Sequence, residues 1–203
     1  MNRTSELIEK LYSCPSGLTG WKRFEDICLE ILCYLFVPYL SNPKIQPRSF
    51  SGIERKDAVF PNRNFDSNNP WGYLLRELEA RLVLFEFKNY DAEEIGKTEV
   101  DQTSNYLTEP MGRLAILCCN KLPNEAAHIR RNTIFSREKK VILFLTKDHL
   151  KEMLFIKERG EESAKINLRA LVSIDLNHSL FKVCVSSRTL RRPLFPPRTI
   201  GSL

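Results

Sequence analysis

An apolar segment that carries two opposite charges constrains the fold of this chain more than any other feature. The segment runs Leu82-Val-Leu-Phe-Glu-Phe-Lys-Asn89. Because successive side chains of a strand alternate between its faces, Glu86 and Lys88 point the same way, while Val83 and Phe85 point the other way. Burying a carboxylate and an ammonium in a central strand is costly unless they pair or hold a cation. The segment therefore predicts a buried strand that carries a charged site.

Two further Glu-x-Lys tripeptides, Glu54-Arg-Lys56 and Glu138-Lys-Lys140, stand among other charged residues, as solvated surface clusters do. The Glu86 copy differs because four apolar residues precede it and a phenylalanine separates its charges. Upstream, Asp57 lies in another short apolar run, so a second carboxylate is expected on a neighbouring strand. Two carboxylates with a lysine beside them suit a divalent cation and the hydrolysis of a phosphodiester. A salt bridge near a sheet edge is the alternative that the tripeptide alone leaves open.

Size and composition fit a globular chain with one core. The 203 residues are 42% apolar and 28% charged, and the longest apolar stretch, 27–40, is interrupted by Glu30 and Pro38. A membrane span needs ~20 predominantly apolar residues, which this stretch does not supply. The first ten residues lack the apolar core of a signal peptide. We therefore expect a cytoplasmic protein with no membrane partner.

The cysteines and the net charge further limit the kinds of protein that this chain can be. No Cys-x-x-Cys pair occurs among the six cysteines and the three histidines stand apart from them, which argues against a zinc site or a disulfide framework. The net charge of +6, with a pI near 9.0, permits nucleic-acid binding without demanding it. Residues 188–203 carry four arginines, three prolines and no acid. We expect a single domain over residues 1–187 and an extended basic tail, which either follows a DNA backbone or docks a partner and aids solubility.

Hydrophobic periodicity and turn residues predict the order of the helices and strands. Antiparallel strands come first and helix–strand alternation follows, which describes a mixed-sheet α/β domain with helices on both faces. The expected helices cover residues 5–12, 20–36, 71–80, 97–108, 123–134, 147–158 and 163–175. The expected strands cover residues 44–50, 56–60, 82–89, 113–119, 141–145 and 180–185.

Three polar residues on the predicted helices join the charged pair. Glu25 follows Phe24 on the long helix, beside its buried face. Gln102 and Tyr106 stand four residues apart and so share one helix face. Each has a plainer explanation: an exposed helix acid in the case of Glu25, and packing against the sheet with the polar ends in water in the other two.

In chain order the constellation reads Phe24-Glu25, Asp57, Glu86-Phe-Lys88 and Gln102-x-x-x-Tyr106. Its order, spacing and placement resemble the PD-(D/E)xK nuclease superfamily over about residues 20–145. Within it, the resemblance is to the branch of Mrr-like restriction endonucleases and archaeal Holliday-junction resolvases. The resemblance implies a restriction-endonuclease-like α/β fold, in which helices flank a four-stranded mixed sheet with a metal site at one end.

The resemblance also implies roles for these residues. The implied metal is Mg²⁺, for which Mn²⁺ would substitute. Its implied ligands are all oxygen donors, which suit this ion: Asp57, Glu86, the main-chain carbonyl of Phe87, and Glu25. Lys88 would orient or help deprotonate the attacking water and balance charge at the phosphate. Gln102 would help position the lysine or the scissile phosphate, and Tyr106 would support Gln102. The implied products carry a 5′-phosphate and a 3′-hydroxyl.

The expected function is therefore that of a Mg²⁺-dependent DNA endonuclease, such as the effector nuclease of a bacterial defence system. Because no sequence-reading module accompanies the core, we expect a homo-oligomer or a partner protein to supply recognition or activation. The alternatives are a structure-selective DNA resolvase or repair nuclease, and a non-catalytic nuclease-fold module that binds DNA or a partner. Trp21, Trp71 and Phe135 are candidates for stacking on bases, although the core is the more common place for such residues.

Overall fold

The structure is a computed structural model that describes residues 2–47, 56–66 and 69–160 of the chain. Helices and strands alternate along most of its length. In chain order the elements are α1 (Arg3–Tyr12), η1 (Gly17–Thr19, a 3₁₀ helix), α2 (Trp21–Phe36), β1 (Lys44–Ile45), β2 (Ala58–Pro61), α3 (Pro70–Glu77), β3 (Leu82–Lys88), α4 (Lys97–Tyr106), β4 (Leu114–Cys119), α5 (Glu125–Glu138), β5 (Val141–Thr146) and α6 (Lys147–Glu158).

The strands form one mixed sheet in the order β1-β2-β3-β4-β5. Strand β2 pairs antiparallel with both β1 and β3, whereas β3, β4 and β5 run parallel to one another. Strands β4 and β5 are buried along their whole length, as parallel strands covered on both faces are. In the β2–β3 register Ala58 lies opposite Phe85, so β2 begins beside the carboxyl end of β3.

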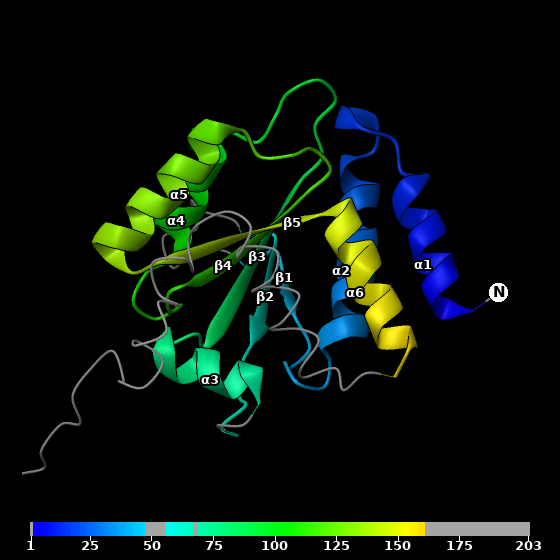
Figure 1. Cartoon of the computed structure of the whole chain (residues 1–203). Coiled ribbons are helices and arrows are strands. Elements are labelled where there is room, and N and C mark those ends of the chain that lie inside the picture. Colours follow the sequence, from blue (N-terminus) through cyan, green and yellow to red (C-terminus); the bar gives the residue numbers. More distant parts are fainter. Residues whose placement is uncertain (1, 48–55, 67–68, 161–203) are drawn as a thin grey trace, which may run out of the picture.

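Helices cover both faces of this sheet (Figure 1). Helices α1, α2 and α6 lie on one face, and α4 and α5 lie on the other. Side chains of β3 alternate between the two cores, because Val83 and Phe85 pack on the side of α2 while Leu84 packs on the side of α4. This is the alternation predicted for the charged segment.

Helix α2 shows how the sequence forms these layers. The apolar side chains on one face of this helix recur every one to four residues and are buried: Phe24, Ile27, Cys28, Ile31, Leu32 and Leu35. The helix ends at Phe36, two residues before Pro38, which cannot continue a helical hydrogen-bond pattern. Glu25 lies on the same helix and is itself buried, which places an acid at the margin of the core.

The predicted fold class, a mixed α/β sheet flanked by helices in the restriction-endonuclease-like manner, is confirmed. Over the residues that the structure describes, the sheet has five strands rather than the implied four, because Lys44–Ile45 adds a short edge strand to β2. The helix expected over 71–80 begins at Pro70, where the Asn69 side chain accepts a hydrogen bond from the main-chain N–H of Trp71, and it ends at Glu77.

Several expected features lie outside the described residues: the helix over 163–175, the strand over 180–185, the boundary at 187 and the tail over 188–203. Within the described ranges, no helix combines the length and the apolar character needed to cross a bilayer.

Candidate active site

The two acidic residues that the sequence assigned to one site meet where β2 begins beside the end of β3. Asp57 immediately precedes β2, and the register that sets Ala58 opposite Phe85 brings Asp57 opposite Glu86. Oδ2 of Asp57 accepts a hydrogen bond from the main-chain N–H of Phe87 over 2.9 Å. The main-chain N–H of Asp57 donates to Oε1 of Glu86 over 3.4 Å. Each acid is therefore held by the strand that carries the other.

Glu86 is a buried carboxyl group with a second carboxyl group beside it. It is 2% exposed, and burial, followed by the negative charge of Asp57, raises the pKa of Glu86 to about 8. The positive charge of Lys88 acts in the opposite direction. Oε2 of Glu86 lies 3.9 Å from Nζ of Lys88, so these two residues form an ion pair when Glu86 is ionised. Crowded carboxyl groups with raised proton affinity are typical of sites that hold a cation or exchange a proton.

A chain of hydrogen bonds holds the Lys88 side chain. Nζ of Lys88 donates to Oε1 of Gln102 over 3.1 Å, and Nε2 of Gln102 donates to the Tyr106 hydroxyl over 3.0 Å. An amide carries its donor and its acceptor on different atoms, so the bond to Tyr106 turns the oxygen of Gln102 toward Lys88. The structure therefore brings Gln102 and Tyr106, predicted from their shared helix face, to the lysine of the site.

Lys56 joins this group, although the sequence predicts a solvated surface cluster for its tripeptide, Glu54-Arg-Lys56. Lys56 is 8% exposed, and its Nζ lies 5.3 Å from the centroid of the Tyr106 ring, which is a cation–π distance. Its charge also lowers the pKa of Glu86, though burial and Asp57 outweigh this effect. Its place next to Asp57 in the chain is the one sequence signal for this role, since the Tyr106 contact arises from tertiary packing.

Glu25 reaches the site through a residue that sequence reasoning missed. Glu25 is 3% exposed, so it is not an exposed helix acid, and its Oε1 accepts hydrogen bonds from Lys22 over 3.1 Å and from Nε2 of Gln46 over 3.2 Å. The main-chain N–H of Gln46 donates to the carbonyl of Asp57 over 2.8 Å. Gln46 thus links Glu25 to the segment that carries Asp57. Its φ of 50° is a left-handed geometry that no pattern in the sequence reveals.

The described residues contain no group of three or more His, Cys, Asp or Glu side chains placed to hold one metal ion together. Asp57 and Glu86 form a pair of acids, and Glu25 does not complete a triad with them. Both main-chain groups of a strand residue face the same neighbouring strand, so the Phe87 carbonyl faces the side from which Asp57 approaches its N–H. Two carboxylates and one carbonyl are donors of the kind that Mg²⁺ accepts while it keeps several waters.

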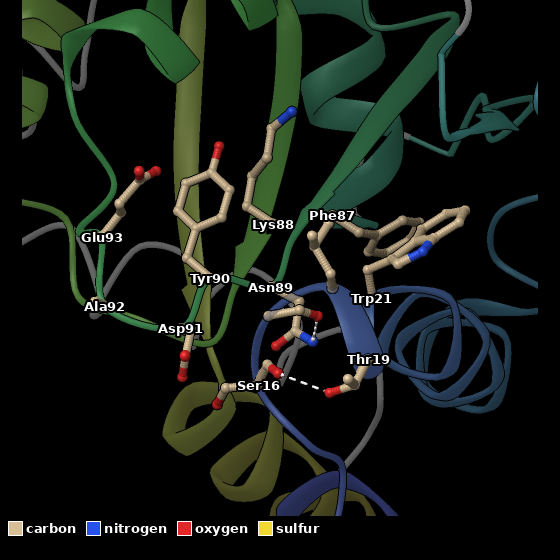
Figure 2. A pocket seen from close by; sticks show the side chains of 12 residues that line it. Ser16, Thr19, Trp21, Phe87, Lys88, Asn89, Tyr90, Asp91, Ala92 and Glu93 are labelled. Atoms are coloured by element: carbon tan, nitrogen blue, oxygen red, sulfur yellow. Dashed lines mark hydrogen bonds between the residues drawn. The ribbon is translucent and has the colours of Figure 1, made fainter.

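A pocket of about 830 Å³ opens beside Lys88, between the carboxyl end of β3 and the turn that contains η1 (Figure 2). Lys88 is part of its wall, so the pocket shares this lysine with the candidate active site. Three aromatic side chains also line it: Trp21, Phe87 and Tyr90. Of the aromatic residues proposed to stack on bases, Trp71 is 1% exposed and Phe135 packs against the core, whereas Trp21 is 47% exposed.

Comparison with known proteins gives one partial match and no family. No family model matches the chain. A curated protein of Escherichia coli (strain K12), the "Putative transposon gamma-delta 80.3 kDa protein", is 31% identical to the chain over 117 residues, which are 57% of it. The chain spans 16% of the length of that relative, so the similarity concerns a small part of the larger protein.

Proposed function

We propose that the protein is a Mg²⁺-dependent DNA endonuclease of the PD-(D/E)xK type. The observation that carries this proposal is the pairing of Asp57 with the buried Glu86, together with Lys88 3.9 Å from the Glu86 carboxylate. A purely structural ion pair would need one acid for one lysine. Here burial and, after it, the charge of a second acid raise the pKa of Glu86, so the site carries a cost that a bound divalent cation would remove.

The donors present fit a magnesium ion. Asp57 and Glu86, with the Phe87 carbonyl, would hold it, and Mn²⁺ would replace it. Mg²⁺ is commonly bound by one or two carboxylates plus substrate phosphates, so two acids suffice without a third. When bound, the ion supplies positive charge that polarises the scissile phosphate and activates a water. Glu25 belongs to the support of the site, through Gln46 and the Asp57 segment.

The residues of the chain then carry out the hydrolysis. Lys88 orients the attacking water, and its positive charge favours loss of that water's proton to solvent and neutralises charge that develops on the phosphate. The water oxygen bonds to phosphorus, the bond from phosphorus to the 3′ oxygen breaks, and a proton from solvent passes to that oxygen. The products are a 5′-phosphate and a 3′-hydroxyl. Gln102 fixes the position of Nζ of Lys88, and Tyr106 fixes the orientation of Gln102.

Charge and the partial match favour DNA as the substrate. The net charge of +6 suits a polyanion, and the relative's name associates it with a transposon, which is a mobile DNA element. We place the protein in the cytoplasm, as an effector nuclease of a bacterial defence system that a second copy or a partner protein activates. A structure-selective DNA nuclease is the second candidate, and the aromatic pocket beside Lys88 favours it.

Cleavage of supercoiled plasmid by the purified full chain tests the proposal. We expect nicked and linear products with Mg²⁺ or Mn²⁺ and none with EDTA, and we expect the new 5′ ends to accept label only after phosphatase treatment, because they carry a phosphate. Equal cleavage in EDTA, or 5′-hydroxyl ends, would contradict it. DNA that is bound but not cut under any metal condition would favour the non-catalytic alternative.

A further inference from the structure

The pocket beside Lys88 is built by a turn that is fastened to the sheet. Nδ2 of Asn89 donates to the carbonyls of Pro15 over 2.9 Å and Gly17 over 3.3 Å. Gly17 has a φ of 73°, and a Cβ there would lie 3.1 Å from Cβ of Asp91, so the turn and the loop after β3 approach closely. One wall of the pocket is therefore fixed before any ligand arrives.

The opposite wall is fixed as well. The Asn120 side chain accepts from the main-chain N–H of Tyr90 over 2.8 Å and donates to its carbonyl over 2.7 Å. The Tyr90 hydroxyl donates to Oε1 of Glu99 over 3.1 Å, which holds its ring in place. In the view of Figure 2, Trp21 and Phe87 lie toward one side of the pocket and Tyr90 toward the other, with Lys88 between them. A preformed site of this kind loses little conformational entropy when a planar ligand enters.

Charge orients a ligand in this pocket. Lys88 lies at the end shared with the candidate active site, while Asp91 and Glu93 line the outer loop. A phosphate is attracted to the lysine and repelled by the two acids. The aromatic part of the pocket therefore suits the neutral base that is attached to a phosphate at Lys88. Trp21, 47% exposed, and Leu18, 90% exposed, present an apolar surface to water that such a base would cover.

We propose that this pocket takes the unpaired base of a nucleotide adjacent to the phosphate held at Lys88, so that the preferred substrate is DNA with a single-stranded or displaced nucleotide at the cleavage point. The inference rests on the proposed nuclease function and specifies its substrate class. A cavity of about 830 Å³ has the size of a small-molecule site, and not of a protein cleft that would hold a DNA duplex. A base enters such a site when it leaves the stack, and aromatic side chains then replace its stacking partners.

Binding of DNA in EDTA tests this proposal without any cleavage. The probes are a short labelled single strand and the blunt duplex that it forms with its complement, and the readouts are anisotropy of the label and tryptophan emission. The chain has two tryptophans, and Trp71 is 1% exposed, so a change of emission on binding reports Trp21. We expect the single strand to bind more tightly than the duplex and to quench Trp21.

Variants give the decisive comparison. Trp21→Ala should weaken single-strand binding about tenfold, as loss of one stacked base does, and leave duplex binding unchanged. Trp21→Phe, which keeps a stacking ring, should retain most of the affinity. Tyr73→Ala is the matched control, because Tyr73 is 42% exposed on α3, at the end of the sheet where β3 begins, away from Lys88.

Equal binding of strand and duplex by the wild-type protein would overturn the proposal, as would unchanged single-strand affinity in folded Trp21→Ala. Circular dichroism establishes that each variant is folded. Because this assay contains no metal, its failure is separable from failure of the nuclease proposal. Metal-dependent cleavage without Trp21-dependent binding would remove the pocket assignment alone. Trp21-dependent binding without cleavage would remove the nuclease alone.

Discussion

The main-chain N–H of Asp57 donates a hydrogen bond to Oε1 of Glu86 over 3.4 Å, so that acids from two neighbouring strands are fixed to each other at the end of β3. The return bond from the Phe87 N–H to Asp57 closes this arrangement. Glu86 also lies 3.9 Å from Nζ of Lys88, and its buried position raises the energetic cost of its charge.

Glu86→Gln keeps the size of the side chain and the acceptor for the Asp57 N–H but removes the negative charge. We expect affinity for Mn²⁺, measured by titration calorimetry, to fall by at least about tenfold. Loss of even a hydrogen-bond partner of a metal ligand usually lowers metal affinity by that factor. Glu138→Gln is a matched control, since Glu138 belongs to another Glu-x-Lys tripeptide and pairs with Lys140 over 2.8 Å. Equal Mn²⁺ affinity in Glu86→Gln and Glu138→Gln would argue against a metal at Glu86.

Lys88→Met preserves the length of the side chain but removes the ammonium group. The rate of DNA cleavage should fall by about 10²–10⁴, the usual contribution of a positioned acid–base group, while Mn²⁺ still binds. Lys140→Met serves as the control in the other tripeptide, and its cleavage rate should match that of the wild type. Cleavage that survives Lys88→Met at the wild-type rate would exclude Lys88 from the chemistry.

The contacts from Lys88 to Gln102 and from Gln102 to Tyr106 predict a coupled effect. Gln102→Leu should lower the cleavage rate by roughly 10–100-fold, and Tyr106→Phe should lower it less, because the amide then loses only its orienting partner. The double variant should be no slower than Gln102→Leu alone, since both changes act on the same lysine. Multiplicative losses in the double-mutant cycle would show that Tyr106 acts independently of Gln102.

The raised pKa of Glu86 predicts how stability depends on pH in the absence of metal. The folded protein keeps a proton on Glu86 up to about pH 8, whereas the unfolded chain releases it near its ordinary pKa of 4.5. Between these values the folded state binds more protons, so the free energy of unfolding falls as pH rises through this window, by up to about 5 kcal/mol.

Thermal unfolding in EDTA from pH 5 to pH 8 measures this effect. Glu86→Gln should flatten the dependence, and Mg²⁺ should restore stability at pH 8, because it binds the ionised form in the folded state. A wild-type protein that gained stability toward pH 8 in EDTA would contradict the assigned environment of Glu86.

The sequence was sufficient for those parts of the fold and site that local periodicity determines. Strand alternation predicted that Leu84 and Phe85 lie on opposite faces of β3, and the structure has them so. The four-residue spacing predicted that Gln102 and Tyr106 share one side of α4, where they form a hydrogen bond. Strand β1 differed in length, because only Lys44–Ile45 of the expected strand pairs with β2 within the described residues.

Features that depend on tertiary packing were outside the reach of the sequence. Gln46 links Glu25 with the Asp57 segment through a left-handed backbone, and Lys56 lies over the Tyr106 ring, fifty positions along the chain. The pocket beside Lys88 likewise arises because Asn89 and Asn120 fasten separate loops together. No sequence spacing connects residues that meet only through tertiary packing. The position of Trp21 in the wall of this pocket was therefore apparent only in the structure.

Cleavage of supercoiled plasmid with Mg²⁺ by the wild-type chain, Asp57→Ala and Lys88→Ala, each compared with Glu138→Ala, distinguishes a nuclease site from a structural ion pair. We expect nicking by the wild type and by Glu138→Ala, none by either of the other two variants, and none by any of them in EDTA. If Asp57→Ala and Lys88→Ala cut as fast as Glu138→Ala, or if cutting persisted without metal, the paired acids and their lysine would not form a nuclease site.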